Sequence, residues 1–168
     1  MKVYSIILSA GKGSRMLSST PKPLHTISGK TMLQWVIDAN HSAGIKKSII
    51  VAPQEFDKFD IENENVTKII QKKPLGTGDA VRKATSLLDN FKGAVLICFA
   101  DTPFITPKTL KRIVNSLNKD NDLVLTGFRK FDKNKYGKII FDNNKKPCEI
   151  IEYKDNKRNK VDSNFCNG

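Results

Sequence analysis

The chain has 168 residues, 39% of them hydrophobic, and carries a formal charge of +12 because 29 Lys and Arg outnumber 17 Asp and Glu. This size and composition predict one folded domain over residues 1–168 and exclude a fibrous or wholly disordered protein. The cations are mostly lysines scattered along the chain, without the interleaved arginines and aromatics of a nucleic-acid surface. We therefore expect no nucleic-acid partner and a positive field that favours anionic small molecules.

Cysteine usage and hydropathy indicate where the protein resides. The three cysteines, Cys98, Cys148 and Cys166, are odd in number and lack C-x-x-C spacing, which fits a reducing compartment. No apolar segment approaches the roughly 20 residues that cross a bilayer. We expect a cytoplasmic protein with no membrane partner.

The first predicted strand, Val3–Leu8, leads into a loop that contains Gly11 and Gly13. These glycines permit a tight turn that aims backbone amides at one anion. Met16 replaces the third glycine of a dinucleotide fingerprint, and the glycine spacing does not match a Walker A loop. Three cations belong to the same stretch: Lys12, Arg15 and Lys22. The loop predicts a phosphate site, with an ordinary strand-to-helix turn and solvated cations as the alternative.

A helix and two strands follow this loop. The helix begins at Thr31, which is expected to form a capping box with Gln34, and Gly44 ends it. Strands are predicted over 48–51 and 66–70, and Gln71 marks the end of the second one. The helix is expected to cover the sheet that these strands form.

The second half of the chain continues the alternation of helices and strands. A helix over 76–88 places an apolar face at Ala80, Val81, Ala84, Leu87 and Leu88. The apolar run 94–99 predicts a central parallel strand that is buried on both sides. Thr106-Pro107 then begins a third helix. A strand over 123–128 and a hairpin over 139–151 complete the predicted elements.

The alternation predicts an α/β fold with a mostly parallel, mixed sheet flanked by helices. In such sheets, ligands bind beyond the carboxyl ends of the strands. Three chemically distinctive segments fall at such ends: the loop 9–15, Gln71 with the nearby Gly76 and Thr77, and Asp101. We expect them to meet at one edge of the sheet.

Asp101 follows the apolar strand within the sequence Ala-Asp-Thr-Pro. A carboxylate at a strand end is suited to a hard divalent cation that bridges phosphates. The competing explanation is that Asp101 caps the next helix. Thr106 is the better cap because it immediately precedes a proline in the first turn. Asp101 is therefore predicted to be free for another role, although a lone aspartate at a strand end is only a weak signal for a metal site.

Five sequence blocks occur in order along the chain: LSAGKGSRM at 8–16, PKPLH at 21–25, QKKPLGTGDA at 71–80, FADTPFI at 99–105 and IEYKD at 151–155. Together they resemble the uridyltransferase domain of bacterial N-acetylglucosamine-1-phosphate uridyltransferases. The resemblance implies a Rossmann-like nucleotide-diphospho-sugar transferase fold. It also implies that UTP and an amino-sugar 1-phosphate, N-acetylglucosamine 1-phosphate, react to give UDP-N-acetylglucosamine and pyrophosphate, with Mg²⁺ as cofactor.

The resemblance also assigns roles to individual residues. It implies three catalytic residues, Arg15, Lys22 and Asp101, with Asp101 as the metal ligand. The nucleotide and its phosphates would contact Leu8, Ser9, Ala10, Gly11, Lys12, Gly13, Arg15, Lys22, Gln71, Gly76, Thr77, Phe99, Ala100 and Asp101. The amino sugar would contact Gly137, Glu152 and Asn167.

The implied reaction needs no protein nucleophile, because a sugar-phosphate oxygen attacks the α-phosphorus of UTP. Positioning and charge stabilisation can then supply most of the catalysis. Lys22 would steady the α-phosphate, while Mg²⁺ and Arg15 would offset charge on the departing pyrophosphate.

The chain also departs from the family pattern. Phe99 and Ala100 stand where the family commonly has tyrosine and glycine, and the family's second metal ligand, an asparagine, lies beyond Gly168. The acetyltransferase domain of the family is absent as well. We expect a C-terminally incomplete fragment of a longer protein, which can be oligomeric at full length. The alternative is a shortened relative whose metal site is incomplete.

Three other functions remain open from the sequence. A related nucleotidyltransferase with another base or sugar is the nearest of them. A noncatalytic nucleotide-sugar binder would fit the missing metal ligand. A nucleic-acid-binding module rests on charge alone and is least favoured.

Overall fold

A computed structural model describes residues 1–9, 16–56, 59, 61, 63–73, 75–118, 121–132, 134–153, 155 and 163–167. The chain separates into two compact units, Met1–Ser116 and Leu117–Gly168. The prediction of one nucleotidyltransferase domain over 1–168 stays a prediction.

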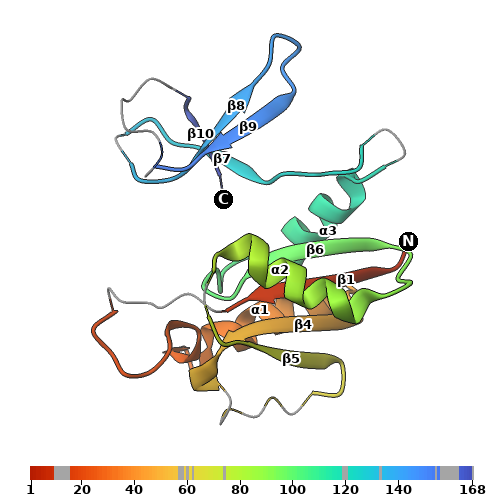
Figure 1. Cartoon of the computed structure of the whole chain (residues 1–168), viewed down its shortest axis with the longest axis vertical. Helices are drawn as coiled ribbons and strands as arrows, with labels where there is room; N and C mark the ends of the chain where they lie inside the picture. The colour runs from red at the N-terminus through yellow and green to blue at the C-terminus, as the bar shows by residue number, and fades with distance from the viewer. Residues whose placement is uncertain are drawn as a thin grey trace. The chain divides into compact units, whose positions relative to one another are not determined.

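A parallel four-stranded sheet forms the centre of the first unit (Figure 1). Its strands are β1 (Val3–Leu8), β4 (Lys47–Pro53), β5 (Val66–Gln71) and β6 (Ala94–Phe99), arranged in the order β5-β4-β1-β6. All three strand pairs are parallel. The predicted strands are confirmed, and β4 is longer than its predicted core. Because β1 has β4 on one side and β6 on the other, the direction of strand addition reverses at β1.

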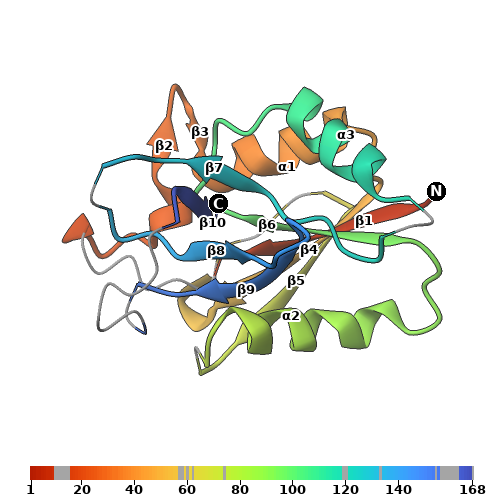
Figure 2. The same cartoon turned by 90° about the horizontal axis from the view of Figure 1, so that it is seen from above.

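Helices cover both faces of this sheet (Figure 2). Helices α1 (Met32–Ser42) and α3 (Pro107–Ser116) lie on one face, and α2 (Thr77–Thr85) lies on the other. A 3₁₀ turn, η4 (Ser86–Leu88), continues α2. Helix α1 lies in the crossover from β1 to β4, and α2 lies in the crossover from β5 to β6, which runs in the opposite direction across the sheet. Two right-handed crossovers of opposite direction place their helices on opposite faces.

Strand alternation divides the apolar side chains between two clusters. Ile7 and Ile50 face α1 and α3, where they join Leu33 and Leu110 in the larger cluster. Their neighbours along the strands face α2 and form the smaller cluster, made of Ile6, Leu8, Ile49, Val51, Ala80 and Ala84. Since successive side chains of a strand point to opposite faces, both sides of the sheet are buried at its centre.

The ends of α1 follow the predicted capping chemistry in part. The backbone N–H of Gln34 donates to Thr31 Oγ1 at 3.0 Å, which confirms Thr31 as the N-cap of α1. The reciprocal half of the expected capping box is wrong, because the Gln34 side chain donates to Asp38 instead. Gly44 follows the helix with a φ of +89°, a conformation that favours glycine.

Strand β6 corrects the expectation of burial on both sides. Val95, Ile97 and Phe99 are 39%, 48% and 37% exposed, whereas the alternate residues of the strand are buried. The reason is topological: β6 is the last strand of the described sheet, and α2 packs against β1, β4 and β5. Leu87, expected on the buried face of its helix, is 51% exposed in the 3₁₀ turn.

A small two-stranded ribbon lies between β1 and α1 in the sequence. It pairs β2 (Thr26–Ile27) with β3 (Lys30–Thr31) in antiparallel register. Two short 3₁₀ turns also belong to the first unit, η2 (Lys22–Leu24) and η3 (Gln54–Phe56). None of the helices in the described segments is both long and apolar enough to cross a membrane.

The second unit contains an antiparallel sheet in the order β7-β10-β8-β9. Its strands are β7 (Gly127–Arg129), β8 (Lys138–Phe141), β9 (Pro147–Ile151) and β10 (Phe165–Asn167). The predicted hairpin over 139–151 is confirmed as β8 and β9. The predicted strand over 123–128 is wrong over most of its length, because ladder pairing begins only at Gly127.

Candidate functional site

Three predicted segments meet at the carboxyl edge of the parallel sheet. Gln71 ends β5, Ser9 follows β1, and Asp101 follows β6. Backbone hydrogen bonds extend the pairing beyond the strands: Ser9 N donates to Val51 O at 2.8 Å, and Ala100 N donates to Leu8 O at 2.9 Å. The predicted shared edge is confirmed, and it includes the point where strand order reverses, where such sheets bind ligands.

Most of the predicted phosphate loop lies outside the described residues. Five predicted site residues lie outside the described residues: Ala10, Gly11, Lys12, Gly13 and Arg15. Their roles stay predictions. The surroundings of the loop are described on both sides, by Ser9 before it and by Met16 after it.

Ser9 is a buried polar residue beside this loop. The residue is only 2% exposed, and its hydroxyl oxygen has no hydrogen-bond partner in the part of the chain that the structure describes. Leaving a buried hydroxyl unpaired costs free energy, and such groups in native proteins generally have a reason. The Ser9 hydroxyl thus lies at the carboxyl edge of the sheet without a partner among the described residues.

Lys22 and Asp101 form an ion pair at the end of β6. Lys22 Nζ lies 2.7 Å from Asp101 Oδ2, although 79 positions separate the two residues in sequence. The 3₁₀ turn η2 presents Lys22, and the buried Pro23 anchors that turn. The two side chains are 37% and 41% exposed, so solvent and ligands can reach both groups.

Asp101 is not used to cap the following helix. Thr106 Oγ1 accepts a hydrogen bond from Thr109 N at 3.2 Å, which confirms Thr106 as the cap of α3. Among the described residues, no group of three or more His, Cys, Asp and Glu side chains could hold a metal. Asp101 nevertheless fits Mg²⁺, which is commonly held by one or two carboxylates with phosphates and waters. Its carboxylate already holds a cation, the Lys22 ammonium group.

Gln71 is positioned by an acidic residue that the sequence analysis did not select. Gln71 is 3% exposed, and its Nε2 donates to Asp79 Oδ2 at 2.8 Å. Asp79 lies in the first turn of α2, where it also accepts from Arg82 at 2.9 Å. These hydrogen bonds, from Gln71 first and then from Arg82, lower the pKa of Asp79. The only sequence signal for this role was the position of Asp79 within the block 71–80.

Gly76 and Thr77 lie where β5 connects to α2. Gly76 is the N-cap of α2 and has a φ of +108°, which a side chain would strain. Thr77 is the first residue of the helix. The turn brings the helix N-terminus next to the end of β5, so that Asp79 reaches Gln71.

The remaining predicted residues of the first unit are mainly structural in the geometry described. The Leu8 side chain belongs to the cluster under α2, which leaves its backbone as the group nearest the strand ends. Ala100 is 1% exposed and packs in the larger cluster. Phe99 is 37% exposed at the end of β6, and its carbonyl accepts from the Thr102 hydroxyl at 2.7 Å.

The second unit brings together the three residues predicted to bind the amino sugar. Asn167 N donates to Gly137 O at 2.9 Å. A Cβ added at Gly137 would lie 3.3 Å from the carboxylate atoms of Glu152, so an alanine there would require that carboxylate to move by a few tenths of an ångström. Gly137 is buried, whereas Glu152 is exposed. The three residues thus lie close together, and their sugar-binding role stays a prediction.

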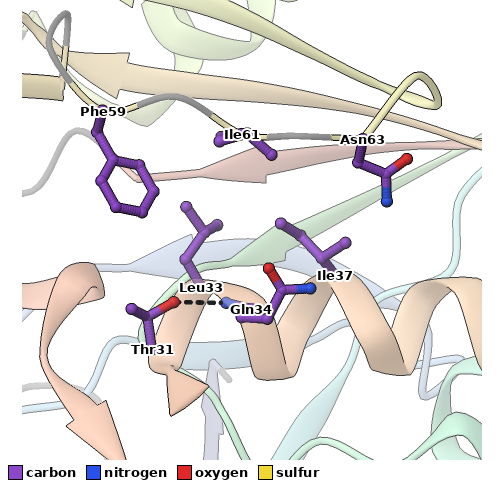
Figure 3. A pocket seen from close by; sticks show the side chains of 7 residues that line it. All are labelled: Thr31, Leu33, Gln34, Ile37, Phe59, Ile61 and Asn63. Atoms are coloured by element: carbon purple, nitrogen blue, oxygen red, sulfur yellow. Dashed lines mark hydrogen bonds between the residues drawn. The ribbon is translucent and has the colours of Figure 1, made fainter.

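A cavity of about 280 Å³ lies between α1 and the segment that precedes β5 (Figure 3). Its described lining consists of Thr31, Leu33, Gln34, Ile37, Phe59, Ile61 and Asn63, and none of these seven residues is a predicted site residue. Leu33 and Ile37 belong to the larger apolar cluster, and Ile61 packs against it. Among the described lining residues there is no acid, base or cation, which distinguishes this cavity from the Lys22–Asp101 and Gln71–Asp79 pairs.

Comparisons with known sequences agree with the resemblance seen in the five blocks. A family model described as the MobA-like NTP transferase domain matches residues 5–136. The bifunctional protein GlmU of Parvibaculum lavamentivorans is 36% identical over 168 residues, covering 98% of this chain and 37% of the relative. The GlmU of Thermoanaerobacter pseudethanolicus is 38% identical over 155 residues, covering 91% and 34%. The chain thus spans little more than a third of the length of these relatives.

Solved structures confirm the predicted fold. A UDP-glucose pyrophosphorylase complexed with UDP-glucose is similar to this chain with a TM-score of 0.78 and 20% sequence identity. The match covers 99% of this chain and 74% of the pyrophosphorylase chain. Rv0371c of Mycobacterium tuberculosis H37Rv, solved in complex with manganese, has a TM-score of 0.56 and 18% identity, covering 68% and 59%. Because the family model extends from within β1 to just before β8, the chain belongs to the MobA-like NTP transferase domain family.

Proposed function

We propose that the chain is a uridylyltransferase module that takes UTP and N-acetylglucosamine 1-phosphate to UDP-N-acetylglucosamine and pyrophosphate. The observation that carries the proposal is the Lys22–Asp101 pair at the strand ends, 2.7 Å between charged atoms and open to solvent. A nucleoside triphosphate with its metal offers one charge for each partner: phosphate oxygens for Lys22 and a divalent cation for Asp101. The similarity to GlmU proteins supports the choice of base and sugar.

Lys22 and Ser9 are the described residues that would bind the phosphates. Lys22 would leave Asp101 for an α-phosphate oxygen and offset the charge that builds up as the sugar-phosphate oxygen attacks. The unpartnered Ser9 hydroxyl would donate to the nucleotide beside it. Arg15 and Lys12 of the phosphate loop are proposed to hold the triphosphate tail.

Asp101 would hold Mg²⁺ together with phosphate oxygens and water. When bound, the ion would supply charge neutralisation for the leaving pyrophosphate. The binding of Mg²⁺ at this position requires Asp101 to exchange the Lys22 ammonium group for the ion. Gln71, held in place at the end of β5, is proposed to contact the uracil ring, with Gly76 and Thr77 beside it.

The cluster in the second unit is proposed to bind the acetylated amino sugar. Glu152 offers a carboxylate for sugar hydroxyls, and Asn167 offers amide groups. Gly137 keeps this approach free of side-chain atoms. A variant with alanine at Gly137 is expected to weaken sugar-phosphate binding more than UTP binding.

The direct test is pyrophosphate release by the full 168-residue chain with UTP, N-acetylglucosamine 1-phosphate and Mg²⁺. Substitution of CTP, GTP or dTTP for UTP, and of other sugar phosphates for the amino sugar, checks the specificity. Saturable, metal-dependent release with UTP preferred supports the proposal. A preference for another base or sugar would assign the chain to a related nucleotidyltransferase.

A noncatalytic nucleotide-sugar binder is the second candidate function. It is favoured by one observation: the described residues include no group of three or more His, Cys, Asp and Glu side chains that could hold a metal. Calorimetry with UDP-N-acetylglucosamine separates the two candidates. Binding without turnover at saturating Mg²⁺ would support the binder, whereas turnover above the Asp101→Ala background would exclude it.

A further inference from the structure

The hydrogen bond between Gln71 and Asp79 fixes a side chain at the carboxyl edge of the parallel sheet, where the nucleotide site is proposed. Gln71 ends β5 and is 3% exposed, while Asp79 lies one turn into α2. Gln71 Nε2 and Asp79 Oδ2 are 2.8 Å apart. The bond joins the end of β5 to the first turn of α2, across the turn at Gly76. Because α2 is a rigid element, its Asp79 restrains the side chain of Gln71.

Asp79 is held as a carboxylate by its own partners. Arg82 NH2 donates to Asp79 Oδ1 at 2.9 Å, and Lys83 Nζ lies 3.9 Å from Oδ2. The hydrogen bonds from Gln71 and Arg82 lower the pKa of Asp79, which keeps it ionised at neutral pH. An ionised carboxylate only accepts hydrogen bonds. Asp79 can therefore accept a hydrogen bond from the NH₂ group of the Gln71 amide but cannot form one with its carbonyl oxygen.

This restriction removes one of the two orientations of the Gln71 amide. Its NH₂ group must face Asp79, so its carbonyl oxygen must face the other way. Within the part of the chain that the structure describes, no group donates to that carbonyl oxygen. Gln71 can thus offer a ligand its carbonyl oxygen as an acceptor and its second N–H as a donor. The relative positions of these two groups are fixed by the bond to Asp79.

A fixed order of donor and acceptor distinguishes uracil from cytosine. Uracil presents an N3–H donor beside its O4 acceptor, whereas cytosine presents an N3 acceptor beside its N4–H₂ donor. For a pyrimidine ring held in one position, an amide that matches uracil must flip by 180° to match cytosine. We infer that Asp79 is a positioning residue that prevents this flip and so sets the preference for uracil over cytosine. The inference rests on the proposed function, in which Gln71 contacts the base.

The competing role for Asp79 is structural. An acidic residue in the first turn of a helix stabilises the helix through its dipole and through i,i+3 pairing with Arg82. That role predicts a change in stability, and it predicts that the affinities for UTP and CTP change by the same factor. The ratio of the two affinities is therefore the informative quantity.

The test compares wild type, Asp79→Asn and Arg82→Gln by calorimetric titration with UTP and with CTP in the presence of Mg²⁺. Asparagine has nearly the same shape as aspartate, but its amide can donate or accept, so Gln71 can flip. We expect the UTP preference to fall about tenfold in Asp79→Asn, about the worth of one hydrogen bond. Arg82→Gln keeps the carboxylate and removes one of its partners, so its UTP preference is expected to match wild type.

Thermal melting of each variant without nucleotide reports the structural role separately. An unchanged UTP-to-CTP ratio in a folded Asp79→Asn variant would overturn the inference while leaving the proposed function standing. A wild-type chain that binds neither nucleotide would instead overturn the proposed function. A ratio that falls equally in Arg82→Gln would also overturn the inference, since the loss would then follow local charge rather than the orientation of the amide.

Discussion

The end of β6 and the junction of β5 with α2 each contain an aspartate with a polar partner, but the two arrangements differ in kind. Asp101 has one partner, Lys22, and both side chains are more than a third exposed. Asp79 has three partners, and its side chain is only 10% exposed. An exposed single pair is weak and easily exchanged. A shielded network with several hydrogen bonds is retained and positions its members.

The difference indicates that the same residue type can serve two purposes at one edge of the sheet. In the proposed function, a metal-bound nucleotide replaces the Lys22–Asp101 pairing with contacts of its own. The Gln71–Asp79 hydrogen bond is proposed to persist while the ligand binds. Changes at Asp101 and Lys22 should therefore affect chemistry and metal binding, and changes at Asp79 should affect base selection.

Asp101→Ala should produce the largest effect. We expect turnover to fall roughly a hundredfold or more, in the range seen when one charge-stabilising group is removed from an active site. The melting temperature should hardly change, because the side chain is exposed. Asp38→Asn is the matched control, since Asp38 pairs with Lys30 at 2.6 Å on α1. Near-normal pyrophosphate release by Asp101→Ala would contradict the metal role.

Lys22→Gln should have two effects of opposite sign. Affinity for UTP should fall about tenfold, as expected for loss of a charge-assisted hydrogen bond to phosphate. Affinity of the nucleotide-free protein for Mn²⁺, measured by electron paramagnetic resonance, should rise because the ion no longer competes with an ammonium group for Asp101. Lys30→Gln removes the same charge elsewhere and frees Asp38. An equal rise in Mn²⁺ affinity in Lys22→Gln and Lys30→Gln would show a general charge effect. It would contradict a specific role for the Lys22–Asp101 pair.

Ser9→Ala extends the comparison to the end of β1, which lies between β5 and β6 in the sheet. The nucleotide-free protein should be as stable as wild type or more stable by up to about 1 kcal/mol, because an unpaired buried hydroxyl is removed. UTP affinity should fall. Ser5→Ala is the matched control: Ser5 Oγ donates to Ser48 Oγ at 2.8 Å, so its loss should destabilise by about 1 kcal/mol. Chemical denaturation measures both, and equal destabilisation would contradict a ligand role for Ser9.

The smallest effect concerns pH. Because the folded-state pKa of Asp79 lies below its ordinary value of 3.8, its network stabilises the fold fully above that pH. The stabilisation is lost as the pH falls through 3.8 toward the lowered value. Asp79→Asn should therefore show a shallower loss of unfolding free energy between pH 5 and 3 than wild type, as expected for one fewer linked proton. Identical acid profiles would indicate that Asp79 is not held by its partners in solution.

Local chemistry made much of the fold predictable. Val3–Leu8 is an apolar run between a charged start and a glycine loop, and Thr31 is a good cap, so both elements could be read from neighbouring residues. The burial of β6 could not, because exposure of Val95 and Ile97 depends on which strand or helix lies beside them. The strand expected over 123–128 failed for the same reason, since pairing requires a partner elsewhere in the chain.

The sequence by itself determined which chemistry is present and in what order: a glycine loop with cations, Gln71 before a glycine turn, and Asp101 after an apolar strand. Only the tertiary structure decided which of these groups touch. It places Lys22 within hydrogen-bond distance of Asp101, 79 positions away in sequence, and it places Asp79 so that it accepts a hydrogen bond from Gln71. The physical reason is that propensity, periodicity and capping act over a few residues, whereas side-chain pairing depends on how distant strands and helices pack.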